Sequence, residues 1–225
     1  MNFQPAYRLK LYRNFKALGA NDFHGMVRYY EQNEDGIVTL DFEEYFDCVL
    51  LYTQALHEIG DFGKHVVMSD HLLELIIMNS IESWGGEDIY ARVLLRKATS
   101  QFNLYEFAKA EHVLRELIKL HPRDVHSRQL LLHVLLDQKP PWLQKIRAVA
   151  VALTLIAALA IALEIFVVNP FFPQWFNTAL VVHNIFLIGG ILTFALGEWR
   201  HYFVCRKGSY GFANEMCKRK MRKAS

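Results

Sequence analysis

Two long apolar stretches near the C-terminus constrain what this chain can fold into more than any other feature. Residues 148–168 and 178–197 are 21 and 20 residues long, and Glu164 is the only charged residue in them. At about 1.5 Å per residue, helices of this length span roughly 30 Å, the thickness of the hydrocarbon core of a bilayer. The sequence therefore predicts an integral membrane protein with a transmembrane hairpin over residues 141–204.

The flanks of these stretches predict their orientation. The connection at 169–177 contains four aromatic residues and no charge, which is typical of a hairpin tip at a membrane interface. Basic residues lie at the opposite ends of both spans, namely Lys145, Arg147, Arg200, Arg206 and Lys207. Because short flanks rich in Lys and Arg stay in the cytoplasm, we expect both termini to be cytoplasmic and the tip 169–177 to lie outside.

The charge is divided unevenly along the chain. Residues 1–140 hold 15 Lys and Arg against 20 Asp and Glu, whereas residues 141–225 hold 10 against 3, which together give the net charge of +2. The acidic part is predicted to be a cytoplasmic domain in water. Residues 31–47 contain seven acids and no base, so we expect no nucleic-acid partner.

The first 140 residues show helical periodicity interrupted by short breaks. Asp41 with Glu44 resembles a capping box, and Ser69 is a predicted N-cap. Alternation typical of a strand is confined to residues 37–40, so an all-α fold is predicted. The expected helices cover residues 6–18, 23–32, 42–58, 69–80, 87–102, 105–120 and 124–136.

Two segments of this region recur. Residues 49–51 and 72–76 are echoed by residues 93–95 and 114–118, at offsets of 44 and 42. Such a period predicts stacked helical hairpins.

Residues 94–122 resemble a tetratricopeptide repeat. Ala98, Ala110, Leu114 and Pro122 match the small, A-x3-F and closing-proline positions of that family, while Lys97 and Gln101 depart from it. The resemblance implies a solenoid of helical hairpins that binds other proteins in a groove.

Patterns that would indicate a cofactor or an enzyme are weak. Glu31 to Phe42 resembles a calcium loop, but its last position lacks the required acid, so an acidic connecting loop is the better interpretation. The histidines show no metal-binding spacing, so no metal and no cofactor is predicted. The Arg-x(4 to 6)-His spacing of some helical ribonucleases occurs at Arg115/His121 and Arg128/His133, where surface or packing roles are the better interpretation. We therefore expect a protein that is not an enzyme.

The three cysteines define no disulfide framework. Cys48 is expected to be a core residue, and Cys205 and Cys217 to be thiols beside the membrane in a reducing cytoplasm. The position of Cys205 also allows S-acylation.

Polar residues within the spans are predicted to have a role. Glu164 and His183 each lie a few residues from the hairpin tip, so both should sit at similar depth, with Asn184 beside them. A charge within a span is usually paired or faces water. Either Glu164 bonds His183 or Asn184 within one hairpin, or Glu164 side chains from several subunits surround an aqueous path.

Small residues at four-residue spacing predict close helix packing, within the hairpin or against a neighbouring subunit. They are Gly189, Thr193 and Gly197 on the second span, and Ala148, Ala152, Ala158 and Ala162 on the first. The basic tail 205–225 is expected to adhere to anionic lipid headgroups through Lys218, Arg219, Lys220, Arg222 and Lys223.

The sequence as a whole predicts a membrane-anchored, oligomeric helical-repeat protein that acts as a protein-interaction scaffold at the cytoplasmic membrane face. The alternative is an oligomeric pore or channel that the soluble domain assembles or gates. The sequence does not identify a protein partner.

Overall fold

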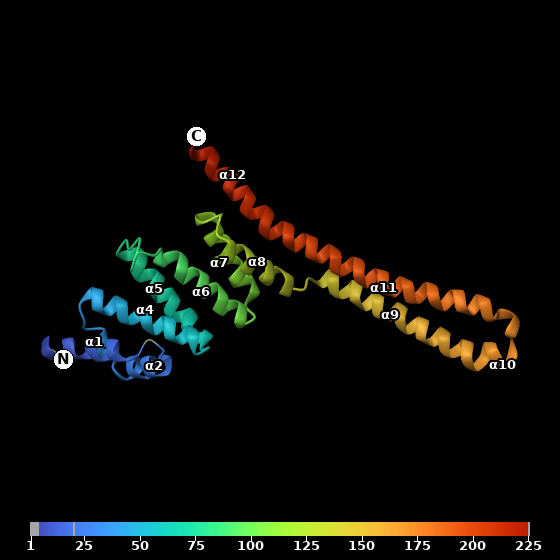
Figure 1. Cartoon of the computed structure of the whole chain (residues 1–225), viewed down its shortest axis with the longest axis horizontal. Helices are drawn as coiled ribbons and strands as arrows, with labels where there is room; N and C mark the ends of the chain where they lie inside the picture. Colours follow the sequence, from blue (N-terminus) through green and yellow to red (C-terminus); the bar gives the residue numbers. More distant parts are fainter. Residues whose placement is uncertain (1–4, 20, 225) are drawn as a thin grey trace. The chain divides into compact units, whose positions relative to one another are not determined.

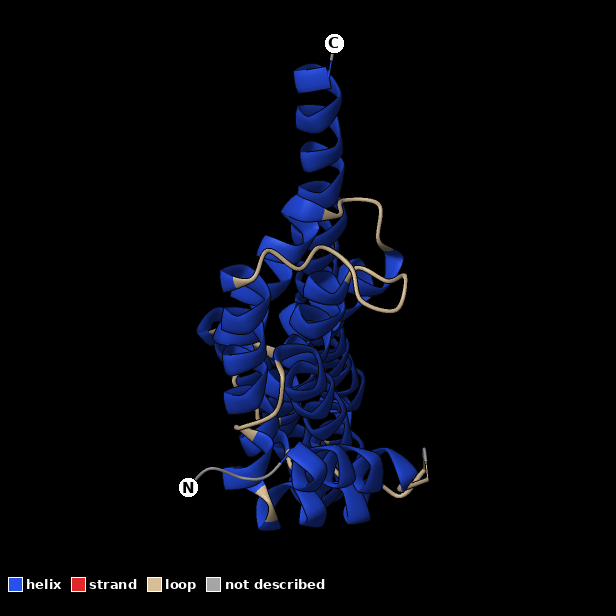
Figure 2. Cartoon of the chain, turned by 90° about the vertical axis from the view of Figure 1, so that its left-hand side faces the viewer, coloured by secondary structure: helices blue, strands red, loops and turns tan. Residues whose placement is uncertain are grey.

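The computed structural model describes residues 5–19 and 21–224, and the chain divides into two compact units, residues 1–134 and 135–225. The side chains of residues 5–7, 173, 223 and 224 lie outside this description. Helix is the dominant structure throughout the described part, which contains no strand (Figures 1 and 2). The predicted all-α fold is therefore confirmed, and the division between the two compact units falls within a helix.

The first unit is built from successive short helices joined by tight turns. Asp22 and Asp88 accept backbone hydrogen bonds from Gly25 and Ala91 at 2.9 Å, so each satisfies a free N–H group at a helix start. The helices are α1 (Pro5–Ala17), α2 (Phe23–Gln32), α3 (Glu34–Ile37), α4 (Phe42–Glu58), α5 (Phe62–Met78), α6 (Ile89–Asn103), α7 (Phe107–Leu120) and α8 (Val125–Asp137), the last of which crosses into the second unit.

Two local expectations are wrong in this unit. The helix predicted from residue 69 begins at Phe62, because Asp61 is its N-cap and accepts from the Lys64 N–H at 3.2 Å. Ser69 is therefore a buried residue in mid-helix and not a cap. Asp41 does precede α4, but its side chain makes no capping hydrogen bond. Residues 38–40 form a turn after α3, which ends at Ile37, in agreement with the predicted absence of strand.

The predicted repeat corresponds to two helical hairpins with matching buried positions. Val49 of α4 and Leu72 of α5 are buried, and so are Val93 of α6 and Leu114 of α7, which occupy the equivalent places. Each of these helices packs on the next in sequence, so the packing is repeat-like. A tetratricopeptide arrangement remains a prediction from residues 94–122.

The second unit is an antiparallel pair of long helices with a helical C-terminal extension (Figure 1). Pro141 occupies the first turn of α9, where its missing N–H costs no hydrogen bond. The predicted tail continues from α11 without a turn. The elements are α9 (Pro141–Leu163), the π-helical η1 (Glu164–Val168), α10 (Asn169–Phe171), the 3-10 turn η2 (Pro173–Trp175), α11 (Phe176–Arg206), the π-helical η3 (Lys207–Gly211) and α12 (Phe212–Ala224).

Candidate functional site

The paired helices α9 and α11 have the length and composition to span a membrane. Their most apolar windows have mean hydropathies of 2.7 and 2.1, and only 11% and 6% of these windows is buried within the structure. A helix of similar composition in a soluble core would be largely buried. The large apolar side chains are instead well exposed, by 54% to 74% for Leu155, Phe166, Ile188 and Leu196.

Glu164 and His183 meet between the two helices. The Oε2 atom of Glu164 lies 2.7 Å from Nδ1 of His183, and only 6% of Glu164 is exposed. The separation is that of an ion pair, although the two atoms lack the alignment of a linear hydrogen bond. The structure thus places Glu164 and His183 together within one hairpin. Asn184 follows His183 in the sequence, is half-buried and makes no hydrogen bond with the described residues.

A second ion pair, which the sequence reasoning missed, joins the helices at the other end of the hairpin. Arg147 donates to Oε1 of Glu198 through Nε at 2.6 Å, and its NH2 group lies equally close. Arg147 was predicted only as a basic flank of the first span, and Glu198 carried no prediction. The pair could have been predicted from the sequence, because a base directly precedes the first span and an acid directly follows the second.

Glycines set the closest approach of the two helices. A Cβ atom at Gly190 would lie 2.8 Å from Cγ2 of Thr154 and 3.2 Å from the carbonyl oxygen of Ala150. A Cβ atom at Gly197 would lie 2.7 Å from Cγ2 of Ile146. Both positions are buried, so small residues here allow close backbone contact.

The other small residues of the predicted packing set face elsewhere. Nothing lies within 4 Å of a Cβ atom built at Gly189, and Thr193 uses its hydroxyl to donate to the Gly189 carbonyl at 2.7 Å. The four alanines predicted to pack, Ala148, Ala152, Ala158 and Ala162, are all exposed. Ala150 and Ala157, which were not predicted to pack, are buried. The exposed set is therefore not used inside this hairpin.

Side chains of α11 close the C-terminal end of α8. A ring nitrogen of His201 lies 3.1 Å from the carbonyl oxygen of Leu136, and the Cys205 thiol donates to the carbonyl of Leu135 at 3.3 Å. These carbonyls have no partner within α8, because they belong to its last turn. Trp142 packs on the His201 ring. Cys205 is a buried free thiol, with 6% of its surface exposed.

The basic tail residues lie on α12. Lys218, Arg219, Lys220 and Arg222 are exposed, and Arg219 donates to Glu215 at 2.6 Å. The side chain of Lys223 lies outside the described residues.

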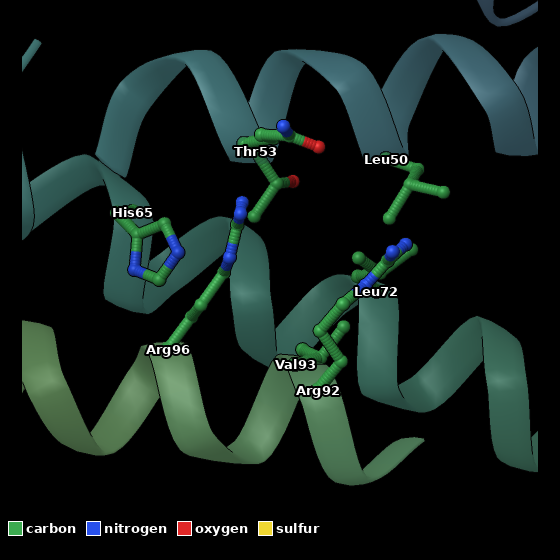
Figure 3. Close-up of a pocket in the computed structure, with 8 residues that line it drawn as sticks. Leu50, Thr53, His65, Leu72, Arg92, Val93 and Arg96 are labelled. Atoms are coloured by element: carbon green, nitrogen blue, oxygen red, sulfur yellow. The ribbon is translucent and has the colours of Figure 1, made fainter. Parts of the chain in front are cut away.

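The first unit contains a buried polar cluster around His65 (Figure 3). Its Nδ1 atom lies 2.8 Å from the hydroxyl oxygen of Ser100, and its ring is 5.1 Å from that of His57. In Figure 3, Arg96 reaches from α6 toward Thr53 of α4 beside this ring. Burial, and secondarily His57 and Arg96, lowers the pKa of His65 to about 4, so the ring is neutral at pH 7.

Residues considered for metal binding or nuclease chemistry have separate partners. Arg115 pairs with Glu111 at 2.8 Å and His121 with Asp88 at 3.0 Å. Arg128 donates to the carbonyl oxygens of Asp124 and Arg123. Within the described residues, no group of three or more His, Cys, Asp or Glu is placed to hold a metal ion.

Comparison of the chain with known protein families, with curated proteins and with solved structures gives no match. The paired helices and their polar residues therefore stand as the candidate site on their geometry alone.

Proposed function

We propose that this protein is a membrane-anchored helical-repeat scaffold, held in the bilayer by the α9–α11 hairpin and assembled into oligomers. The observation that carries the proposal is that large apolar side chains are exposed along both helices, where only 11% and 6% of the most apolar windows is buried. Exposure of such a surface to water is unfavourable by about 25 cal/mol per Å² of apolar area. The hydrocarbon core of a bilayer is the environment that these helices favour.

The polar contacts of the hairpin agree with insertion. An unpaired charge costs about 2.5 to 3.5 kcal/mol at the centre of a span and less nearer the interface. Glu164, which lies a few residues from the hairpin tip, has its partner within the same hairpin. The pair Arg147–Glu198 lies at the opposite end, where the predicted spans meet the cytoplasmic side. We place both termini in the cytoplasm because the basic flanks lie at this end and the tip 169–177 has no charge.

Two exposed surfaces support assembly at the membrane. The outward-facing small residues Ala158, Ala162 and Gly189 are free of contacts between α9 and α11, so a neighbouring hairpin can approach them closely. The exposed bases of α12 suit anionic headgroups, to which each Lys or Arg near the surface contributes about 1 kcal/mol. The first unit, with its own apolar core, is then presented to cytoplasmic proteins.

The competing function is an oligomeric pore whose spans line a conduit, and it separates from the scaffold in liposomes. The full chain is reconstituted at high load into liposomes that contain a trapped dye, together with the variant Glu164→Gln. We expect the dye to be retained with both proteins, because Glu164 is paired inside its own hairpin and does not face a lumen. Dye release that Glu164→Gln alters would support the pore and contradict the scaffold.

A further inference from the structure

The first unit contains an open cleft between the end of α5, the loop 79–88 and the end of α7, here called the α5–α7 cleft. Its volume is about 730 Å³, within the range of sites that accept several side chains of a ligand. Ile76, Ile77, Ile81 and Leu120 form an apolar floor, and Ile77 is 63% exposed. The cleft is open to solvent along this floor.

The loop that borders the cleft has a fixed shape. Gly85 and Gly86 have φ angles of +62° and +83°, and Trp84 and Glu87 exchange backbone hydrogen bonds of 3.1 and 3.3 Å across this turn. The Trp84 ring packs on Phe46, with ring centroids 4.7 Å apart. Because these contacts hold the loop, we expect ligand binding to the cleft to cost little loop conformational entropy.

The rim of the cleft is acidic. Glu82, Glu87 and Asp88 are all exposed along it, and the only basic side chain in the lining is His121, which lies 3.0 Å from Asp88. Arg92 pairs with Glu87 from α6 at 2.5 Å. Glu82 makes no ion pair or hydrogen bond with the described part of the chain, so its charge is available to a ligand.

We propose that the α5–α7 cleft binds a basic, amphipathic peptide helix, of the kind that this chain itself carries as α12. Such a helix offers apolar side chains to the isoleucine floor and Lys or Arg to the acidic rim. In α12, Phe212 and Met216 lie one turn apart, next to the bases Lys218, Arg219 and Lys220. The proposal deepens the scaffold function by assigning the chemistry of its partner.

The test measures binding of a fluorescent peptide to the full chain in nanodiscs of neutral lipid. The peptide consists of residues 212–222 with Cys217→Ser, and its anisotropy is followed during titration. We expect saturable binding that Glu82→Lys weakens about tenfold or more, because like charges then meet at the rim. The matched control is Glu43→Lys, which makes the same charge change at an exposed site on α4 and should leave the affinity unaltered.

Two further titrations separate the cleft from its alternatives. A peptide with Phe212→Ser and Met216→Ser keeps every charge and should bind at least about tenfold more weakly, since the apolar floor loses its contacts. A chain with Lys218→Glu and Arg219→Glu removes competition from its own α12 and should bind the peptide at least as well. Absence of binding to that chain, equal weakening by Glu82→Lys and Glu43→Lys, or equal binding of the two peptides would overturn the proposal. None of these results depends on membrane insertion, so the scaffold function fails or survives separately in the liposome assay.

Discussion

Acidification from pH 6.5 to 4 is expected to lower the free energy of unfolding of the first unit by about 3 kcal/mol through His65 alone. In the folded unit, burial lowers the pKa of His65 from 6.5 to about 4. The unfolded chain therefore binds a proton over this range that the folded unit does not bind. The stability that the first unit gains from keeping the His65 ring neutral is therefore present above pH 6.5 and is lost as the pH falls from 6.5 to 4.

The measurement is urea unfolding of the full chain in micelles at several pH values, followed by the fluorescence of Trp84. Because Trp84 packs on Phe46, it reports on the first unit once Trp142, Trp175 and Trp199 are replaced by Phe. In His65→Gln the acid dependence should shrink by more than half, with a remainder from His57, whose pKa burial also lowers. The exposed His24 provides the control His24→Gln, which should retain the full dependence. An unchanged slope in His65→Gln would contradict the buried neutral ring.

The second large effect is expected from Gly190→Leu in the hairpin. A side chain at this position meets Thr154 and the Ala150 carbonyl oxygen, so the helices must separate, at a cost of about 1 to 3 kcal/mol or more. Gly189→Leu adds the same atoms one residue earlier, where nothing lies within 4 Å of the Cβ position. Both changes replace a glycine with a better helix former, so they differ only in the face they occupy.

Spin labels on the outer faces measure this separation. Cysteines introduced at Leu155 and Ile188, which are 61% and 54% exposed, carry the labels in a chain with Cys48→Ala, Cys205→Ser and Cys217→Ser. We expect a longer and broader distance distribution for Gly190→Leu and the parent distribution for Gly189→Leu. The same response from both variants would show that α9 does not pack on the Gly190 face.

Helix positions in this chain follow closely from local sequence, because caps and turns are local. The bounds predicted for α2 and α4 agree with the structure, since Asp22 and Asp41 directly precede them. The start predicted for α5, residue 69, is too late, because Asp61 caps this helix and its first turn includes Gly63. Ser69 instead lies one turn after His65 within α5, with its hydroxyl oxygen 3.4 Å from the buried His65 ring.

Contacts between distant segments were predictable only where symmetry about a turn fixes the register. Glu164 and His183 lie similarly far from the hairpin tip, which is why their proximity could be predicted. The face through which α11 packs on α9 could not be predicted in this way. A four-residue spacing of small side chains defines a stripe along one face of a helix, but it does not show whether that face meets the other helix. Adjacent residues point about 100° apart, so a shift of one residue changes the face. Gly190, and not Gly189, therefore meets α9. Nothing local links His65 to Ser100, which is 35 residues away.

The central claim, a membrane hairpin with cytoplasmic termini, is tested most directly by labelling of single cysteines in cells that produce the protein. One chain carries Gln174→Cys at the hairpin tip as its only thiol, and another retains only Cys217 on α12. With an impermeant maleimide we predict labelling of Gln174→Cys in intact cells and of Cys217 only after permeabilisation. Labelling of Cys217 in intact cells, or protection of Gln174→Cys until the membrane is opened, would contradict the claim.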